Sequence, residues 1–136
     1  MDRLFLDANV LFSAAYLPAS PLRRLWELDA AELLTSGYAA AESYRNLSAK
    51  RPQQLTDLAR LLDQVRLVWD AVGPLSPSVA SHLPAKDRPI LQAAIAARVT
   101  HLLTGDKQHF GSLFGQSVLG VLVLTPGEYL RLRCDA

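Results

Sequence analysis

Residues 4–11 of the chain are Leu4-Phe5-Leu6-Asp7-Ala8-Asn9-Val10-Leu11. The apolar run at 4–6 is typical of a short strand that is buried in a parallel sheet, and it ends at an acidic residue. Apolar residues then recur at helical spacing as far as Ala15. This stretch therefore predicts a buried strand that passes directly into a helix.

The same alternation continues along the chain. Further apolar runs predict strands at residues 32–36, 67–69, 101–104 and 121–124. Helical spacing or capping signals predict helices over 22–28, 39–47, 52–65 and 90–97, and after residue 125. Ser20 is the predicted N-cap of the first of these helices, and Thr125-Pro126-Gly127-Glu128 has the form of a capping box before the last. The stretch 73–86 contains three prolines, so we expect a loop there with at most a short helix around Val79. Strands that alternate with helices predict an α/β fold: a central five-stranded parallel sheet with helices on both faces.

Size and composition fit one soluble domain covering residues 1–136. Half of the residues are apolar, and the formal net charge is +1, which neither favours nor excludes a nucleic-acid partner. The single cysteine, Cys134, cannot form an intrachain disulfide. No apolar stretch approaches the roughly 20 residues that span a bilayer, and Asp7 and Asn9 interrupt the first apolar run. We therefore expect a cytoplasmic protein without a membrane segment.

Four acidic residues occupy positions where a ligand site is expected. Asp7 ends the first strand, Glu42 lies in the first turns after the second, and Asp106 follows the fourth by two residues. Asp87 begins the helix before that fourth strand. Ligand sites of open α/β sheets form at the carboxyl ends of the strands. Clustered carboxylates repel one another, and divalent cations such as Mg²⁺ remove that repulsion. The four acids together indicate a metal site suited to phosphodiester hydrolysis.

Each acid also has a simpler explanation when it is taken alone. Asp7 and Asp87 could each cap the helix that follows, and Glu42 could be a solvated helix residue. The segment Thr104-Gly105-Asp106 could be an ordinary turn. Only the joint pattern favours the metal site.

Three motifs resemble those of PIN-domain ribonucleases, in the same order and across nearly the whole chain. The segment 6–11 resembles their opening Asp-x-Asn strand, and Ala41-Glu42-Ser43-Tyr44-Arg45-Asn46 resembles their second acidic motif. The stretch from Lys86 to Lys107 is similar to their third acid on its helix, followed by a strand and a Thr-x-Asp motif. The chain departs from the pattern at Ala85-Lys86, where many relatives carry another acid.

The resemblance implies a Rossmann-like sheet in the order 3-2-1-4-5 that binds Mg²⁺ or Mn²⁺ and cuts RNA. It implies that Asp7, Glu42, Asp87 and Asp106 are metal ligands, directly or through water. Asn9 and Thr104 would orient these ligands. Some members are the toxin of a toxin–antitoxin pair, the VapC type, and small members are often homodimers. RNA, an antitoxin protein and a second copy of the chain are therefore the expected partners.

Several other side chains are candidates for secondary roles. Basic residues near the acids could contact RNA phosphates, namely Arg45, Lys86, Arg88 and Lys107. His109 could contact RNA or assist a proton transfer. Trp26 and Trp69 lie in apolar runs, so we expect both in the core.

Two competing functions remain open from the sequence. The first is a catalytically weak PIN fold that acts through RNA or protein contacts. The second is a phosphoryl-transfer enzyme that resembles haloacid-dehalogenase-like hydrolases, with Asp7 as an aspartyl nucleophile. That family requires an acid two residues after the nucleophile, and this chain has Asn9 there.

Overall fold

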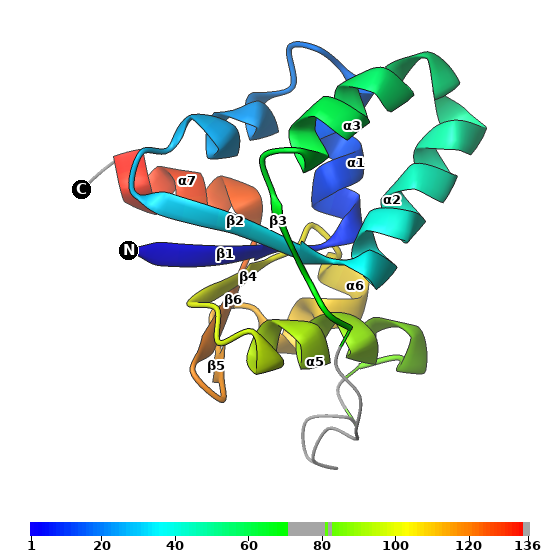
Figure 1. Ribbon diagram of the computed structural model, residues 1–136. Helices are drawn as coiled ribbons and strands as arrows, with labels where there is room; N and C mark the ends of the chain where they lie inside the picture. The colour runs from blue at the N-terminus through cyan, green and yellow to red at the C-terminus, as the bar shows by residue number, and fades with distance from the viewer. Residues whose placement is uncertain (71–80, 82, 135–136) are drawn as a thin grey trace.

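The computed structural model describes residues 1–70, 81 and 83–134. Its described strands form one sheet in the order β3-β2-β1-β4-β6-β5 (Figure 1). They are β1 (Asp2–Leu6), β2 (Ala31–Ser36), β3 (Arg66–Val68), β4 (His101–Leu103), β5 (Ser117–Val118) and β6 (Val121–Leu124). The five predicted strands are parallel and follow the predicted order. The α/β fold is confirmed, with an additional antiparallel strand, β5, that was not predicted.

Helices connect the strands as the periodicity predicted, with differences in type and length. The α-helices are α1 (Ala8–Tyr16), α2 (Gly37–Lys50), α3 (Leu55–Leu62), α5 (Arg88–Ala96), α6 (Lys107–Phe110) and α7 (Pro126–Cys134). The 3-10 helices are η1 (Pro21–Glu27), η2 (Pro52–Gln54), η3 (Ala85–Asp87) and η4 (Gly111–Leu113). The predicted helix 52–65 is thus divided into η2 and α3. The short helix expected around Val79 lies outside the described residues.

The sheet separates two hydrophobic cores. Leu4 and Leu6 of β1 belong to one core and Phe5 to the other, because successive side chains of a strand point to opposite faces. The first core is filled mainly from α1, α3, α7 and η1, and the second mainly from α5 and α6. Figure 1 shows α1 and α3 on one side of the sheet and α5 on the other. This burial on both faces explains why the central strands are continuous apolar runs.

The unpredicted strand β5 pairs with β6 through a two-residue turn. Leu119 and Gly120 both have positive φ, at 50° and 88°. Such turns match the twist of the paired strands and usually carry Asn-Gly or Asp-Gly. Leucine is unusual in this conformation, so the hairpin carries no recognisable sequence signal.

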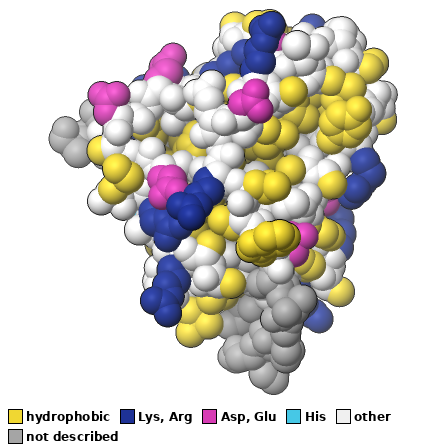
Figure 2. Space-filling model, viewed as in Figure 1, with side chains coloured by type: hydrophobic (Ala, Val, Ile, Leu, Met, Phe, Trp, Pro, Cys, Tyr) yellow, Lys and Arg dark blue, Asp and Glu magenta, His cyan; other side chains and the backbone are white. Residues whose placement is uncertain are grey.

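The two tryptophans have different environments. Trp26 packs against the first core and donates from Nε1 to the Leu61 carbonyl oxygen at 3.0 Å, as expected for a core residue. Trp69 is 94% exposed, so the prediction that it lies in the core is wrong. It follows β3, which pairs with β2 at the edge of the described sheet and along which hydrophobic side chains reach the surface (Figure 2). Among the described residues, no helix has both the length and the apolar character needed to cross a membrane.

Candidate metal centre

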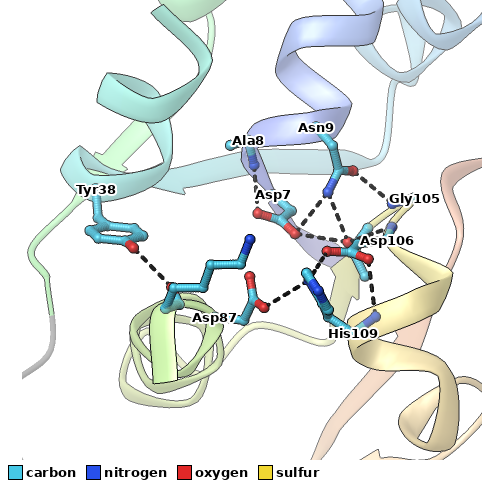
Figure 3. A network of polar contacts seen from close by, with 10 residues as sticks. Asp7, Ala8, Asn9, Tyr38, Asp87, Gly105, Asp106 and His109 are labelled. Carbon is cyan, nitrogen blue, oxygen red and sulfur yellow. Dashed lines mark hydrogen bonds and ion pairs between the residues drawn. The ribbon is translucent and has the colours of Figure 1, made fainter. Parts of the chain in front are cut away.

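Three of the four predicted acids converge at the carboxyl edge of the sheet. Asp7 lies between β1 and α1, Asp87 ends η3 at the start of α5, and Asp106 lies between β4 and α6. Figure 3 shows the three carboxylates pointing toward one another, with His109 beside the Asp106 carboxylate. Three separate segments of the chain therefore contribute acids to one place.

Asp7 is held in position by a network of donors. Its side chain is almost fully buried, and the Ala8 backbone N–H donates to Oδ1 at 2.7 Å. Oδ2 accepts from the Thr104 hydroxyl at 2.8 Å and from the Asn9 amide at 3.0 Å. The contact with Ala8 matches the capping alternative, but the contacts with Oδ2 come from residues that a cap does not need. Both candidates for orienting residues, Asn9 and Thr104, are therefore in direct contact with Asp7.

Asn9 also joins the two motifs that supply Asp7 and Asp106. Its Oδ1 accepts from the Gly105 backbone N–H at 2.7 Å, and its amide donates to the Thr104 hydroxyl at 3.2 Å. A Cβ at position 105 would lie 3.3 Å from the Asn9 oxygen, which is a tight contact. Glycine at this position therefore allows the loop after β4 to approach α1 closely.

Burial raises the pKa of Asp7 to about 6. The hydrogen bonds from Thr104 and Ala8 act in the opposite direction, and the charges of Glu42 and Asp87 raise the pKa further. The donors around Asp7 therefore do not fully compensate its charge. A cation next to the carboxylate would do so.

Asp87 and Asp106 are joined by His109. The ring nitrogen Nδ1 lies 2.7 Å from Asp106 Oδ2 and 3.1 Å from Asp87 Oδ2. Burial is the main cause that raises the pKa of Asp87, and the Asp106 charge adds to it, whereas His109 and Lys86 lower it. Asp87 makes no capping hydrogen bond to α5, so the structure does not support the capping explanation for this residue. Asp106 does cap α6, accepting from the His109 backbone N–H at 3.0 Å.

The donor set at this place fits a divalent cation. One ligand atom each from Asp87, Asp106 and His109 lie within 4.8 Å of one another. Asp87 Oδ2 and His109 Nδ1 are buried yet make no hydrogen bond of acceptable geometry. Buried polar atoms without partners are costly, and a bound ion would satisfy them. Carboxylate oxygens are the usual ligands of Mg²⁺ and Mn²⁺ in proteins.

Glu42 lies farther along its helix than the sequence suggested. It belongs to α2, which begins at Gly37, and its side chain is partly exposed. In the described part of the chain, the group of close ligand atoms includes neither Glu42 nor Asp7. Glu42 acts on the site through its charge, which raises the pKa of Asp7 and of Tyr38. Its role as a ligand stays a prediction.

Tyr38 is a residue of the site that sequence reasoning missed. Its hydroxyl donates to the Lys86 carbonyl oxygen at 2.8 Å, across from the acids (Figure 3). This contact ties the start of α2 to the turn that carries Asp87. Burial, with the charges of Glu42 and Asp87, raises the pKa of Tyr38, so the hydroxyl stays a donor. Tyr38 belongs to no motif, and only the packing of α2 against η3 identifies it.

The four predicted RNA contacts do not behave alike. Arg45, Lys86 and Lys107 are exposed. Arg88 is partly buried and donates from Nε to the Leu83 carbonyl oxygen at 3.2 Å, in the segment that precedes its helix α5. Gly105 and Lys107, which flank Asp106, line an open cavity of about 650 Å³ together with the start of α7. Of the three exposed cations, Lys86 lies close enough to Asp87 for its charge to lower the pKa of that acid.

Comparisons with known proteins agree with the observed fold. A family model described as a PIN domain matches residues 3–108. VapBC2 from Rickettsia felis, in a crystal structure bound to a DNA fragment from their promoter, contains a chain with TM-score 0.65 and 16% identity. The similarity covers 90% of this chain and 98% of that one. A chain of VapBC-1 from nontypeable Haemophilus influenzae has TM-score 0.58 and 12% identity, with coverages of 92% and 98%. No curated protein sequence matches the chain significantly. The match over residues 3–108 shows that the chain belongs to the PIN-domain family.

Proposed function

We propose that this protein is a metal-dependent ribonuclease that hydrolyses RNA phosphodiester bonds at the centre formed by Asp7, Asp87 and Asp106, with Glu42 acting through water. PIN domains are generally nucleases, which supports a hydrolase acting on nucleic acids. The observation that carries the proposal is the convergence of buried Asp7 with partly buried Asp87 and Asp106, with too few donors to balance their charges. Mg²⁺ or Mn²⁺ would balance their charge.

The residues of the site would have different roles in this reaction. A bound divalent cation would supply the Lewis acidity that phosphodiester hydrolysis needs. Asn9 and Thr104 fix the Asp7 carboxylate, so this ligand would need no reorganisation when substrate binds. Tyr38 holds the turn before Asp87 in place. Arg45, Lys86 and Lys107 are exposed near the acids, where they would neutralise RNA phosphates and orient the strand.

Cleavage of RNA with and without metal tests the proposal. Wild-type protein should cut single-stranded RNA with Mn²⁺ or Mg²⁺ and stop when a chelator is added. Asp106→Asn should reduce the rate by about 100-fold or more, because it removes a negative ligand but keeps the side-chain shape. Asp63→Asn, at an exposed acid after α3, is the matched control and should cut normally. A folded wild type that cuts no RNA with either metal would favour the alternative of a catalytically weak PIN fold that acts through RNA or protein contacts.

We further propose that the protein is the toxin of a VapC-type pair, with an antitoxin protein as partner, and that it forms a homodimer in the cytoplasm. The similarity to chains of two VapBC structures supports an antitoxin partner. Expression in bacteria should arrest growth, and Asp106→Asn should abolish the arrest. Co-expression with the product of a neighbouring short reading frame should restore growth and yield a complex that purifies as one species. Light scattering on the isolated protein tests the homodimer.

The contacts of Asp7 oppose the aspartyl-nucleophile alternative. Both carboxylate oxygens accept hydrogen bonds, and the side chain is almost completely enclosed. A nucleophilic oxygen needs a free approach to phosphorus. Incubation with radiolabelled phosphoryl donors should therefore leave no label on the protein, and label trapped on Asp7 would restore this alternative.

A further inference from the structure

His109 occupies the space between two predicted metal ligands. Its Nδ1 lies 2.7 Å from Asp106 Oδ2 and 3.1 Å from Asp87 Oδ2. Two features fix the backbone that carries the ring. The His109 backbone N–H donates to Asp106 Oδ1, and the next residue, Phe110, is fully buried in the second core. The imidazole is therefore held next to both acids.

Both contacts of the ring lie within ion-pair distance, but neither has the geometry of a hydrogen bond. An imidazolium that neutralised the acids would aim its N–H at one of the two oxygens. Here Nδ1 is buried and makes no hydrogen bond with either oxygen, and Asp87 Oδ2 likewise has no hydrogen-bond partner. The ring nitrogen therefore approaches both acids without being directed at either of them.

The spacing of these atoms instead matches ligands that share one ion. Neighbouring ligand atoms of an octahedral ion, each at about 2.1 Å from the metal, lie about 3 Å apart. The two distances from Nδ1 to the carboxylate oxygens fall on either side of that value. All three residues can offer an atom within 4.8 Å of the others. An ion between them would satisfy both unpartnered atoms at once.

We infer that His109 supplies a nitrogen ligand to the metal centre, beside Asp87 and Asp106, and that the site consequently prefers a divalent transition metal over Mg²⁺. The inference rests on the proposed function, because it names a further ligand of the same centre. The preference follows from ligand chemistry: imidazole nitrogen suits transition metals, whereas Mg²⁺ favours oxygen.

Electron spin-echo spectroscopy of protein-bound Mn²⁺ tests the ligand directly and without an activity assay. Wild-type protein should show modulation from a coordinated imidazole nitrogen, and incorporation of ¹⁵N-histidine should change the modulation frequencies. His109→Gln should remove the modulation. His101→Gln is the matched control, because His101 lies at the opposite end of β4 and contacts Thr100 and Tyr129. That variant should keep the full signal.

Affinities measured by titration calorimetry provide the second readout. His109→Gln should weaken Mn²⁺ binding by about tenfold or more and change Mg²⁺ binding much less. Mn²⁺ that binds the wild type without nitrogen modulation would overturn the inference and leave the proposed ribonuclease intact. Mn²⁺ that remains free in solution would overturn the proposed metal centre as well. If His109→Gln fails to fold, the comparison of wild type with and without ¹⁵N-histidine still tests whether an imidazole nitrogen binds the metal.

Discussion

The two ends of β1 carry aspartates in opposite electrostatic environments. At the amino end, Asp2 Oδ2 accepts from the Tyr129 hydroxyl at 2.6 Å and from Arg133 at 3.2 Å. The hydrogen bond from Tyr129 holds the pKa of Asp2 below its ordinary value, and Arg133 and His101 contribute in the same direction. At the carboxyl end, burial raises the pKa of Asp7, and two further acids add to that rise.

The difference shows how one strand can serve both stability and function. Around Asp2 the fold places a cation and a phenol that stabilise the carboxylate, and Arg3 pairs with Glu32 beside it on the neighbouring strand. Around Asp7 the fold gathers more acids instead. Self-repelling groups in a folded protein need a compensating ligand, and perturbed pKa values cluster at functional sites for this reason. The contrast points to the carboxyl end as the place where a cation binds.

The largest expected difference between the two aspartates is in catalysis. Asp7→Asn should lower metal-dependent RNA cleavage by about 100-fold or more, since it removes a ligand charge and leaves the shape unchanged. Asp2→Asn should cut RNA within about twofold of wild type below its melting temperature, because Asp2 lies at the far end of the strand. Initial rates with Mn²⁺ measure both, and equal losses would remove the distinction between the two ends.

The next difference is in the pH dependence of stability without metal. The folded-state pKa of Asp7, about 6, lies above its ordinary value of 3.8. The contribution of this group to stability is therefore fully present below pH 3.8 and is lost as pH rises through 6. Its full size corresponds to at most about 3 kcal/mol. In chelator, Asp7→Asn should gain stability relative to wild type between pH 4 and pH 7.

Thermal melts of both proteins across this pH range check the sign. Mn²⁺ at a thousandfold excess over Kd should reverse the order at pH 7, because an ion that binds only the folded wild type then stabilises it by about 4.1 kcal/mol. A difference between wild type and Asp7→Asn that does not change with pH would mean that the ionised Asp7 carboxylate does not destabilise the folded protein.

The contribution of Asp2 to stability should depend on pH in the opposite direction and should be smaller. Its pKa is lowered, so its contribution is present above pH 3.8 and is lost as pH falls through the lower folded-state value. Asp2→Asn should therefore destabilise the protein at pH 7 by about 1 kcal/mol, after allowance for its partial exposure. Chemical denaturation at pH 7 and pH 3 measures the effect, which should shrink at the lower pH.

The smallest effect is expected at the exposed ion pairs of the amino end. Glu32 accepts from Arg3 and Arg66, both at 3.3 Å, and the Arg66 side chain is 67% exposed. Solvent screens such pairs, so Glu32→Gln should cost below about 0.5 kcal/mol. Added salt should reduce even this cost, and a loss that persists in high salt would show that these pairs stabilise the fold more than their exposure suggests.

Much of the fold could be read from local patterns in the sequence. Four of the parallel strands are recognisable because they are short apolar runs buried on both faces, whereas β3 is an apolar run at the edge of the sheet. The capping box before α7 forms as predicted, with Thr125 and Glu128 exchanging backbone hydrogen bonds at 3.1 Å. Ser20 caps η1 in the predicted place, although that segment is a 3-10 helix. Hydrophobic periodicity and capping depend on residues that are close together in the sequence, so the sequence alone reveals them.

Other features depended on contacts that no local pattern records. The apolar run ending at Trp69 is typical of a core strand, but β3 lies at an edge of the sheet and leaves the ring exposed. The turn at Leu119 and Gly120 lacks the usual residues, so β5 gave no signal. Tyr38 entered the site only because α2 packs near the turn before Asp87.

By itself, the sequence determined the order of strands and helices and which acids lie at strand ends, since both follow from residue type and spacing. Tertiary structure alone decided which of these acids meet and what else meets them. It brought the Asp7 carboxylate within hydrogen-bonding distance of the Thr104 hydroxyl, and it placed the His109 ring between Asp87 and Asp106. The reason is geometric: the distances between these groups depend on how β1, β4, α5 and α6 pack together, and packing is set by the whole core.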